Sequence, residues 1–271
     1  MKKIIILFLL LLNISYANDY SSYCPNVNSS KSISGSMMSV SGFNFLSRNI
    51  IEHEIKKALK KETGSNFDVK INNFWGSSIL NGEFQSLTLK SKNYSHDGFN
   101  STDLLIETIC PYNKVSYVNN EIKFDYDTVL KFSTTITQQD LNKSLQEGEL
   151  SKFLNKINSS LIKIQSSNLE IQNDKLIFKY KIIPLNLGNF IKPISLSFSS
   201  KLKVKNNQLE LCNVSFNKKQ INYSQLLNMF DLTNLKVNLD RNNKAKVKIE
   251  DVEIKNSKIE LLGYVIILKT K

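Results

Sequence analysis

Histidines, paired carboxylates and cysteines are the residues of this chain that could do chemistry. The two histidines, His53 and His96, do not have the spacing of a metal-ligating cluster. His96 precedes Asp97, but such a pair in a serine-rich chain does not define a catalytic triad. The sequence also lacks the G-x-S-x-G elbow, the P-loop and the G-x-G-x-x-G fingerprint. We therefore expect no enzyme, no cofactor and no metal site.

The best candidate for a catalytic carboxylate pair is Asp125 with Asp127. In an alternating strand these two residues share one face, but Lys123 and Lys131 fall on that same face. Opposite charges at neighbouring positions of a sheet form a solvated ladder. We therefore assign this pair no catalytic role.

The three cysteines, Cys24, Cys110 and Cys212, are candidates for a disulfide. Disulfides persist in exported proteins, but three cysteines cannot all pair within one chain. Cys212 lies inside a strand-like run at 208–216 and is interpreted as a buried free thiol. Cys24 and Cys110 are then the predicted pair. No two cysteines have C-x-x-C spacing, which argues against zinc or thioredoxin-type chemistry.

Long alternating strands are the elements that position these residues. Two stretches, 121–134 and 193–205, alternate apolar and polar residues, and period two places all apolar members on one face. These apolar members are Ile122, Phe124, Tyr126, Leu130 and Phe132 in the first stretch, and Ile194, Leu196, Phe198, Leu202 and Val204 in the second. Such a face must cover a helix, another sheet or a ligand, and this choice decides the function.

The first residues read as a secretory signal peptide. Lys2 and Lys3 precede an unbroken apolar run at 4–12, and Ser15 and Ala17 place small residues at a cleavage site. The run is too short to span a membrane. We expect cleavage after Ala17 and export to the periplasm or cell envelope.

The chain is basic, with 36 lysines and arginines against 24 acidic residues and a net charge of +12. One interpretation places the excess lysines on solvated faces. Another is attraction to an anionic membrane surface. Nucleic acid is not expected as a partner, because the chain is predicted to be exported and has no recognisable nucleic-acid-binding motif.

Three segments follow from the pattern: a signal peptide at 1–17, a flexible polar tail at 18–41 and a single domain at 42–271. A long amphipathic helix is predicted over 42–62, with late lysines that suit the negative end of the helix dipole. Such a helix can lie on a membrane, but it more often packs on a sheet. Two shorter helices are predicted at 149–161 and 223–230.

Local turn and cap signals indicate an antiparallel meander. Thr137 and Asp140 have the spacing of a helix N-cap, with Leu141 and Leu145 on the buried side. Asparagine tolerates positive φ, so asparagine-rich pairs before alternating apolar residues predict hairpin turns. These pairs are Asn119 with Asn120, Asn173 with Asp174, Asn206 with Asn207, and Asn256 with Ser257; a further turn is predicted at Asp97 and Gly98.

Three short motifs belong together: a strand with an L-x-G start at 80–87, the helix start T-x-x-D-L-N at 137–142, and a final strand with a central glycine at 261–267. In this order they resemble the LmeA-like phospholipid-binding proteins of bacterial envelopes. The resemblance implies a tubular lipid-binding fold, in which a curved antiparallel sheet wraps a long helix and leaves an apolar groove. It brings no catalytic residues.

The predicted fold class is therefore α+β, with a curved, mostly antiparallel sheet, a meander or half-barrel, wrapped around the N-terminal helix. The predicted function is non-enzymatic binding of a phospholipid or another acyl lipid in the groove, with rim lysines at the head group or on anionic membrane. The alternative is a structural or adhesive β-rich envelope protein with a fully packed core and no lipid. The residues expected to line the groove are Ile50, Ile51, Ile55, Leu59, Phe124, Tyr126, Phe132, Phe178, Leu196 and Phe198.

Overall fold

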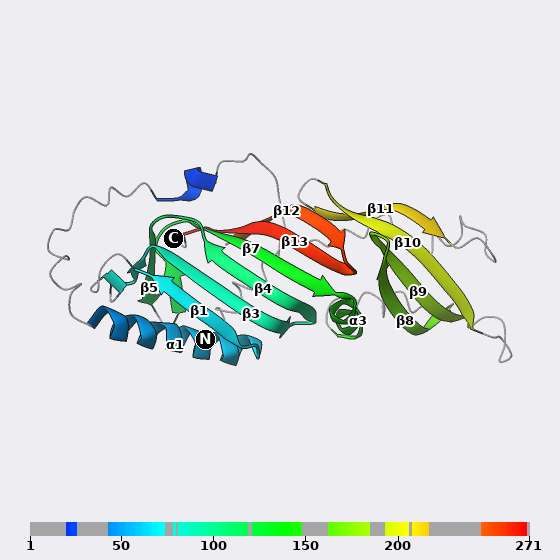
Figure 1. Ribbon diagram of the computed structural model, residues 1–271, viewed down its shortest axis with the longest axis horizontal. Helices are drawn as coiled ribbons and strands as arrows, with labels where there is room; N and C mark the ends of the chain where they lie inside the picture. Colours follow the sequence, from blue (N-terminus) through cyan, green and yellow to red (C-terminus); the bar gives the residue numbers. More distant parts are fainter. Residues whose placement is uncertain are drawn as a thin grey trace.

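The computed structural model describes residues 20–25, 43–73, 78–79, 81–118, 121–147, 162–184, 193–205, 208–216 and 245–269. The molecule is elongated and consists mainly of antiparallel strands, with two larger sheets following one another along the long axis (Figure 1). The prediction of a sheet-dominated α+β fold with mostly antiparallel pairing is confirmed.

The larger sheet has six strands in the order β1-β3-β4-β7-β13-β12. The strands are β1 (Phe67–Asn72), β3 (Ser86–His96), β4 (Phe99–Thr108), β7 (Thr128–Thr137), β12 (Ala245–Lys255) and β13 (Lys258–Ile267). Burial alternates along them: in β1, Phe67, Val69 and Ile71 are buried, and the residues between them are exposed. The sheet therefore has an apolar inner face and a largely polar outer face.

The second sheet has four antiparallel strands in the order β11-β10-β9-β8. They are β8 (Ile162–Gln172), β9 (Lys175–Pro184), β10 (Ile194–Lys205) and β11 (Gln208–Phe216). The predicted strand at 193–205 is confirmed as β10, with Phe198 buried and Ser195 and Lys203 exposed. A bulge in β11 brings Asn213 to a φ of 54° opposite the middle of β10.

A small sheet of β2 (Glu83–Phe84), β5 (Asn113–Val118) and β6 (Glu121–Phe124) corrects the predicted strand at 121–134. That stretch is two strands in two sheets, because the chain leaves β6 after Phe124 and bends at 125–127 before β7. The Asp125 N–H donates to the Lys114 carbonyl (2.9 Å), which holds the bend. Asp125 and Asp127 thus belong to a bend and not to one strand face. The alternation of apolar and polar residues continues through the bend. It indicates which face a side chain takes, but not which strand is the pairing partner.

The predicted hairpin turns are confirmed where the structure describes them. Positive φ occurs at Asp97 (49°) and Gly98 (78°), at Asn173 (48°) and Asp174 (57°), and at Asn256 (51°) and Ser257 (58°). Two successive positive φ values are typical of a type I′ turn, whose twist matches that of the flanking strands. The turn positions 119–120 and 206–207 lie outside the described residues, but the flanking strands pair antiparallel in both cases.

Two α-helices accompany the sheets in the described part of the chain. Helix α1 (Phe43–Thr63) packs against β1, an outer strand of the six-stranded sheet, and ends at Gly64 (φ 73°). Helix α3 (Gln138–Gln146) directly follows β7. Its predicted cap is confirmed: the Asp140 N–H donates to Thr137 Oγ1 (3.3 Å), and the Thr137 N–H donates to Asp140 Oδ2 (2.8 Å).

The predicted disulfide is confirmed, because Cys24 and Cys110 are bonded across a sequence separation of 86. A short 3-10 helix, η2 (Tyr20–Tyr23), precedes Cys24, so this part of the predicted tail is tied to the end of β4. Cys212 is free as predicted, but it is half-buried and not fully buried.

The predicted signal peptide at 1–17, the rest of the tail and the two short helices at 149–161 and 223–230 lie outside the described residues. In the part of the chain that is described, no helix is both long enough and apolar enough to cross a membrane.

Candidate lipid-binding site

The buried apolar side chains of the described residues form four clusters. A small cluster beside the disulfide contains Cys110, Val129 and Ile266, and the other three make up the interior. The helix-side cluster, beside α1, contains Leu59, Phe67, Val69, Ile71, Ile79, Phe84, Leu89, Tyr94 and Leu104. The central cluster, on β7, β12 and β13, contains Leu130, Phe132, Ala245, Val247, Val265 and Ile267. The junction cluster, where the two larger sheets and α3 meet, contains Ile136, Leu145, Leu169, Ile171, Leu176, Tyr180, Ile182, Phe198 and Ile259.

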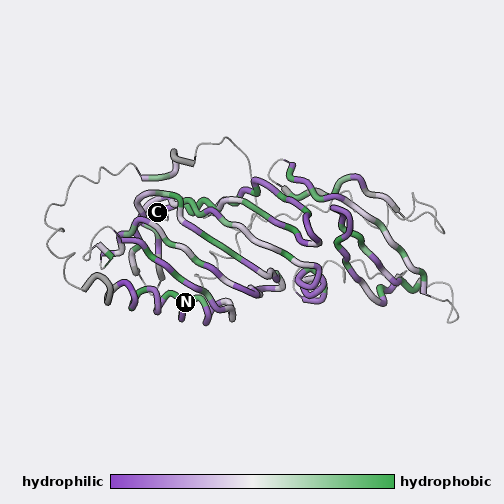
Figure 2. Tube along the Cα trace, in the orientation of Figure 1, coloured by the Kyte–Doolittle hydropathy of each residue, from purple (hydrophilic) through white to green (hydrophobic). Residues whose placement is uncertain are grey.

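Half-buried side chains connect these clusters. Phe99 packs against both the helix-side and the junction clusters. Ile106 and Phe124 pack against both the helix-side and the central clusters. Hydrophobic and hydrophilic residues alternate along the strands of both larger sheets (Figure 2), as expected when one face of each is apolar. The interior is therefore continuous from α1 to the four-stranded sheet.

Eight of the ten predicted groove residues lie in this interior, but they divide among the clusters. Ile51, Ile55 and Leu59 face the helix-side cluster, where Leu59 is fully buried and the two isoleucines are half-buried. Phe124 joins the helix-side and central clusters, and Phe132 belongs to the central cluster. Phe178, Leu196 and Phe198 belong to the junction cluster or pack against it. These eight residues thus lie at three different places along the interior.

The other two predicted residues lie on the surface. The side chain of Ile50 is 63% exposed, and that of Tyr126 is 37% exposed. Ile50 is adjacent to Ile51 on α1, and only one stripe of a helix can face the neighbouring sheet. Tyr126 lies in the bend between β6 and β7, where strand alternation does not apply.

Stacked aromatic rings fill the junction cluster. The Phe178 and Phe198 rings stack with centroids 4.5 Å apart and an interplanar angle of 10°, and Tyr180 stacks on Phe198 at 6.1 Å. Burial raises the pKa of Tyr180 to about 12. In the helix-side cluster, burial and then the charge of Asp97 raise the pKa of Tyr94 above its usual value. Both phenols are therefore neutral in an apolar environment.

Polar contacts fix α1 along β1. Glu52 Oε1 accepts a hydrogen bond from the Ile71 N–H (2.8 Å), which points away from the sheet because β1 is an outer strand. Lys56 Nζ lies 3.1 Å from Asp68 Oδ1, and this hydrogen bond lowers the pKa of Asp68. The periodicity of α1 predicts which residues face a sheet but gives no sign that Glu52 bonds a strand backbone.

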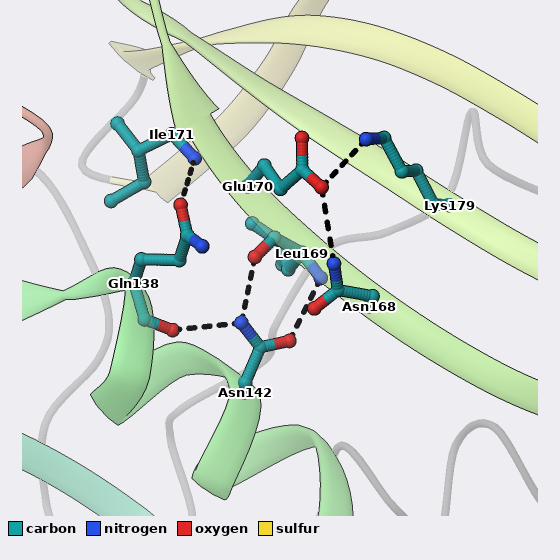
Figure 3. Close-up of polar contacts among 7 residues, drawn as sticks. All are labelled: Gln138, Asn142, Asn168, Leu169, Glu170, Ile171 and Lys179. Carbon is teal, nitrogen blue, oxygen red and sulfur yellow. Dashed lines mark hydrogen bonds and ion pairs between the residues drawn. The ribbon is translucent and has the colours of Figure 1, made fainter.

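Helix α3 is bonded to both larger sheets. Thr102 Oγ1 of β4 donates to Asp140 Oδ2 (2.7 Å). On the opposite side, the Asn142 side-chain amide donates to the Leu169 carbonyl (2.7 Å) and accepts from the Leu169 N–H (2.8 Å). Gln138 Oε1 accepts from the Ile171 N–H (3.1 Å) (Figure 3). We call Gln138 and Asn142 the α3 amides; they follow the backbone of β8 as a neighbouring strand would.

Replacing Asn142 with alanine is expected to lower the free energy of unfolding by about 1–3 kcal/mol, because it leaves the Leu169 N–H and carbonyl without their partner. Urea denaturation of both proteins measures the loss. Lys143→Ala is the matched control, since Lys143 is exposed on the same helix. A loss of equal size in the control would show that the amide bonds do not stabilise the junction.

A concavity of about 510 Å³ lies over the outer face of the six-stranded sheet. Lys90 and Lys92 line one side of it, and Asp251, Glu253 and Glu260 line the other. Mixed charge at the walls makes it unlike the apolar groove expected from the sequence.

The titratable residues considered first do not assemble into a reactive site. His96 Nε2 lies 3.7 Å from Asp97 Oδ2, its neighbour in the turn. Asp127 Oδ1 accepts a hydrogen bond from the Lys269 N–H (2.7 Å). Within the described ranges, no three histidine, cysteine or acidic residues gather in a way that could hold a metal ion.

The motifs behind the family resemblance have local structural roles. Gly82 has a φ of 75°, and its carbonyl accepts a hydrogen bond from the Val115 N–H (3.0 Å). A Cβ at this position would collide with the Val115 carbonyl. Gly263 lies opposite Phe132, where a Cβ would meet the aromatic ring 2.6 Å away. No family model, curated protein or solved structure matches the chain.

Proposed function

We propose that this protein is exported to the bacterial envelope and binds a phospholipid or another acyl lipid without catalysing a reaction. The observation that carries the proposal is the continuity of the apolar interior through the helix-side, central and junction clusters. An acyl chain lying along such an interior gains about 0.8 kcal/mol for each methylene group that it buries. The family resemblance, which implies a tubular fold with an apolar groove, is a second support for the proposal.

Helix α1 is the wall that we expect to move when lipid enters. It packs beside an outer strand of the sheet, and the side chains of Ile51 and Ile55 are only half-buried against the helix-side cluster. Displacing this helix exposes less apolar surface than displacing a central strand would. An acyl chain between α1 and the sheet would then cover the same apolar side chains.

The disulfide and the charge are compatible with an envelope role. A disulfide between Cys24 and Cys110 is stable in an oxidising compartment. The net charge of +12, which becomes +10 when cleavage after Ala17 removes Lys2 and Lys3, favours approach to anionic head groups. If export proceeds as proposed, the mature protein begins at Asn18, and N-terminal sequencing of the periplasmic fraction tests this.

A structural or adhesive β-rich protein is the competing function. It is favoured by the burial of the cluster residues, which are at most 9% exposed. Mass spectrometry of an organic extract from natively purified protein separates the two functions. Stoichiometric acyl lipid supports the proposed function, and its absence from both native protein and protein incubated with anionic phospholipid vesicles overturns it.

Replacing Ile51 with tryptophan is expected to reduce the amount of lipid per folded protein, because the larger ring occupies the space between α1 and the sheet. If no lipid is bound there, the substitution overpacks a core and costs about 1–3 kcal/mol of stability. The measurement is lipid per folded protein, by mass spectrometry of extracts from wild type and variant. Ile50→Trp is the control, since Ile50 is exposed on the same helix. Equal lipid in all three proteins would contradict binding beside α1.

A further inference from the structure

One end of the six-stranded sheet, where β4 ends and β7 begins, presents apolar side chains to solvent. Among the described residues, the exposed large apolar side chains are those of Ile50, Ile109 and Tyr126. Ile109 follows β4 and Tyr126 precedes β7, so two of the three belong to this end. The Ile109 N–H donates to the Val129 carbonyl (3.0 Å), which places the two connections side by side.

Tyr112 and Lys269 complete this surface. The ring centroids of Tyr112 and Tyr126 are 5.9 Å apart at an interplanar angle of 67°, and Lys269 Nζ lies 5.9 Å from the centre of the Tyr126 ring. Strand β5 and the C-terminal end of the chain lie at this same end of the molecule (Figure 1). We call Ile109, Tyr112, Tyr126 and Lys269 the aromatic tip.

The aromatic tip is held rigidly. Cys110 is bonded to Cys24, and Asn113 Nδ2 donates to the Cys110 carbonyl (2.9 Å). On the other connection, the Lys269 N–H donates to Asp127 Oδ1 (2.7 Å). Apolar side chains fixed in an exposed position are typical of a contact surface, because they add little to the core.

We propose that the aromatic tip docks the protein on an anionic lipid bilayer. Tyrosine rings suit the interface between head groups and acyl chains, isoleucine suits the acyl boundary, and lysine reaches the phosphates. The positive net charge of the chain draws it to such a surface. Phe124, two residues before Tyr126, packs in the apolar interior, so the tip adjoins the path of an acyl chain. The inference rests on the proposed function and deepens it by naming the membrane-facing end.

Both acidic and basic side chains adjoin the tip. Partial burial and a hydrogen bond with Glu83 raise the pKa of Tyr112 to about 12, so the phenol is neutral where an anionic surface would repel a phenolate. Glu83 itself lies 3.5 Å from Lys114 Nζ. Its negative charge is thus offset, whereas Asp125, which also raises the pKa of Tyr112, and Asp127 are further acidic residues beside the tip.

The test is co-sedimentation of the full oxidised protein with phosphatidylcholine vesicles that contain phosphatidylglycerol. The double variant Ile109→Ser/Tyr126→Ser is expected to bind these vesicles at least about tenfold more weakly, because both exposed apolar side chains are lost. Removing exposed side chains leaves the fold intact, which thermal unfolding verifies. Tyr126→Trp reports the same contact by fluorescence. When vesicles are added, we expect the tryptophan emission of this variant to shift to shorter wavelength, relative to the emission of wild type.

Ile50→Ser is the matched control, since it removes an exposed isoleucine from α1. We expect it to keep vesicle binding within about twofold of wild type. If Ile50→Ser abolishes binding and the double variant does not, the amphipathic helix is the docking surface and the tip is not. Wild-type protein that fails to sediment with the vesicles also overturns the proposal.

Lipid extraction separates this inference from the function on which it rests. A double variant that retains its co-purified lipid and loses vesicle binding supports docking by the tip as a step distinct from lipid binding. Protein that contains no lipid, either natively or after incubation with the vesicles, but still sediments with them through the tip overturns the lipid-binding function and leaves docking intact. Native protein that contains lipid but ignores vesicles overturns docking alone.

Discussion

Replacing Phe198 with aspartate is expected to destabilise the protein by several kcal/mol. Phe198 is 5% exposed and stacks with Phe178 and Tyr180 in the junction cluster, where a carboxylate would lie among apolar rings. A charge buried without a partner is among the most destabilising changes known. Urea denaturation followed by circular dichroism measures the loss; a variant already unfolded in buffer meets the same expectation.

The control for this change is Lys201→Asp on the same strand. Lys201 alternates with the buried residues of β10 and points to the polar face, so we expect its replacement to change the free energy of unfolding by less than about 0.5 kcal/mol. Equal effects of the two substitutions would mean that the two faces of β10 are assigned incorrectly.

The substitution Cys24→Ser removes the disulfide and is expected to lower the free energy of unfolding by about 4–5 kcal/mol. This is the stabilisation expected when a disulfide acts by restricting the unfolded chain. The bond closes a loop across a sequence separation of 86, and the entropy of closure grows with loop length. Denaturation of wild type with and without dithiothreitol gives the same comparison without a substitution.

Cys212→Ser is the matched control for this loss. Cys212 is free and half-buried, so its replacement is expected to change stability by about 1 kcal/mol or less. Cys24 is a better position for this substitution than Cys110. Cys110 is 1% exposed, and a serine there would add a buried hydroxyl. A Cys24→Ser variant as stable as wild type would contradict a stabilising role for the bond.

Local chemistry made much of the fold predictable. Asparagine-containing pairs such as Asn173 with Asp174 specify type I′ turns, because they tolerate positive φ. Thr137 with Asp140 specifies a helix start through two hydrogen bonds. Both signals depend on residues a few positions apart. The strand at 193–205 followed from period two for the same reason.

Long-range pairing was not predictable from such signals. The stretch at 121–134 keeps one alternation although it contains strands of two sheets, since alternation records faces and not partners. The same limit explains the candidate site: period two and helical periodicity identified Leu59, Phe132 and Phe198 as inward-facing, but did not assign them to three different clusters. The side-chain amides of Gln138 and Asn142 carry no sequence signal that distinguishes a bond to β8 from a bond to water.

The α3 amides also affect how this protein meets its own copies. β8 ends its sheet, and an uncovered strand edge invites pairing with a strand of another chain, which leads to swapped dimers and fibrils. Asn142 and Gln138 occupy the backbone groups of Leu169 and Ile171 that an incoming strand would need. Helix α3, which contacts both larger sheets, therefore also hinders self-association of this protein at high concentration.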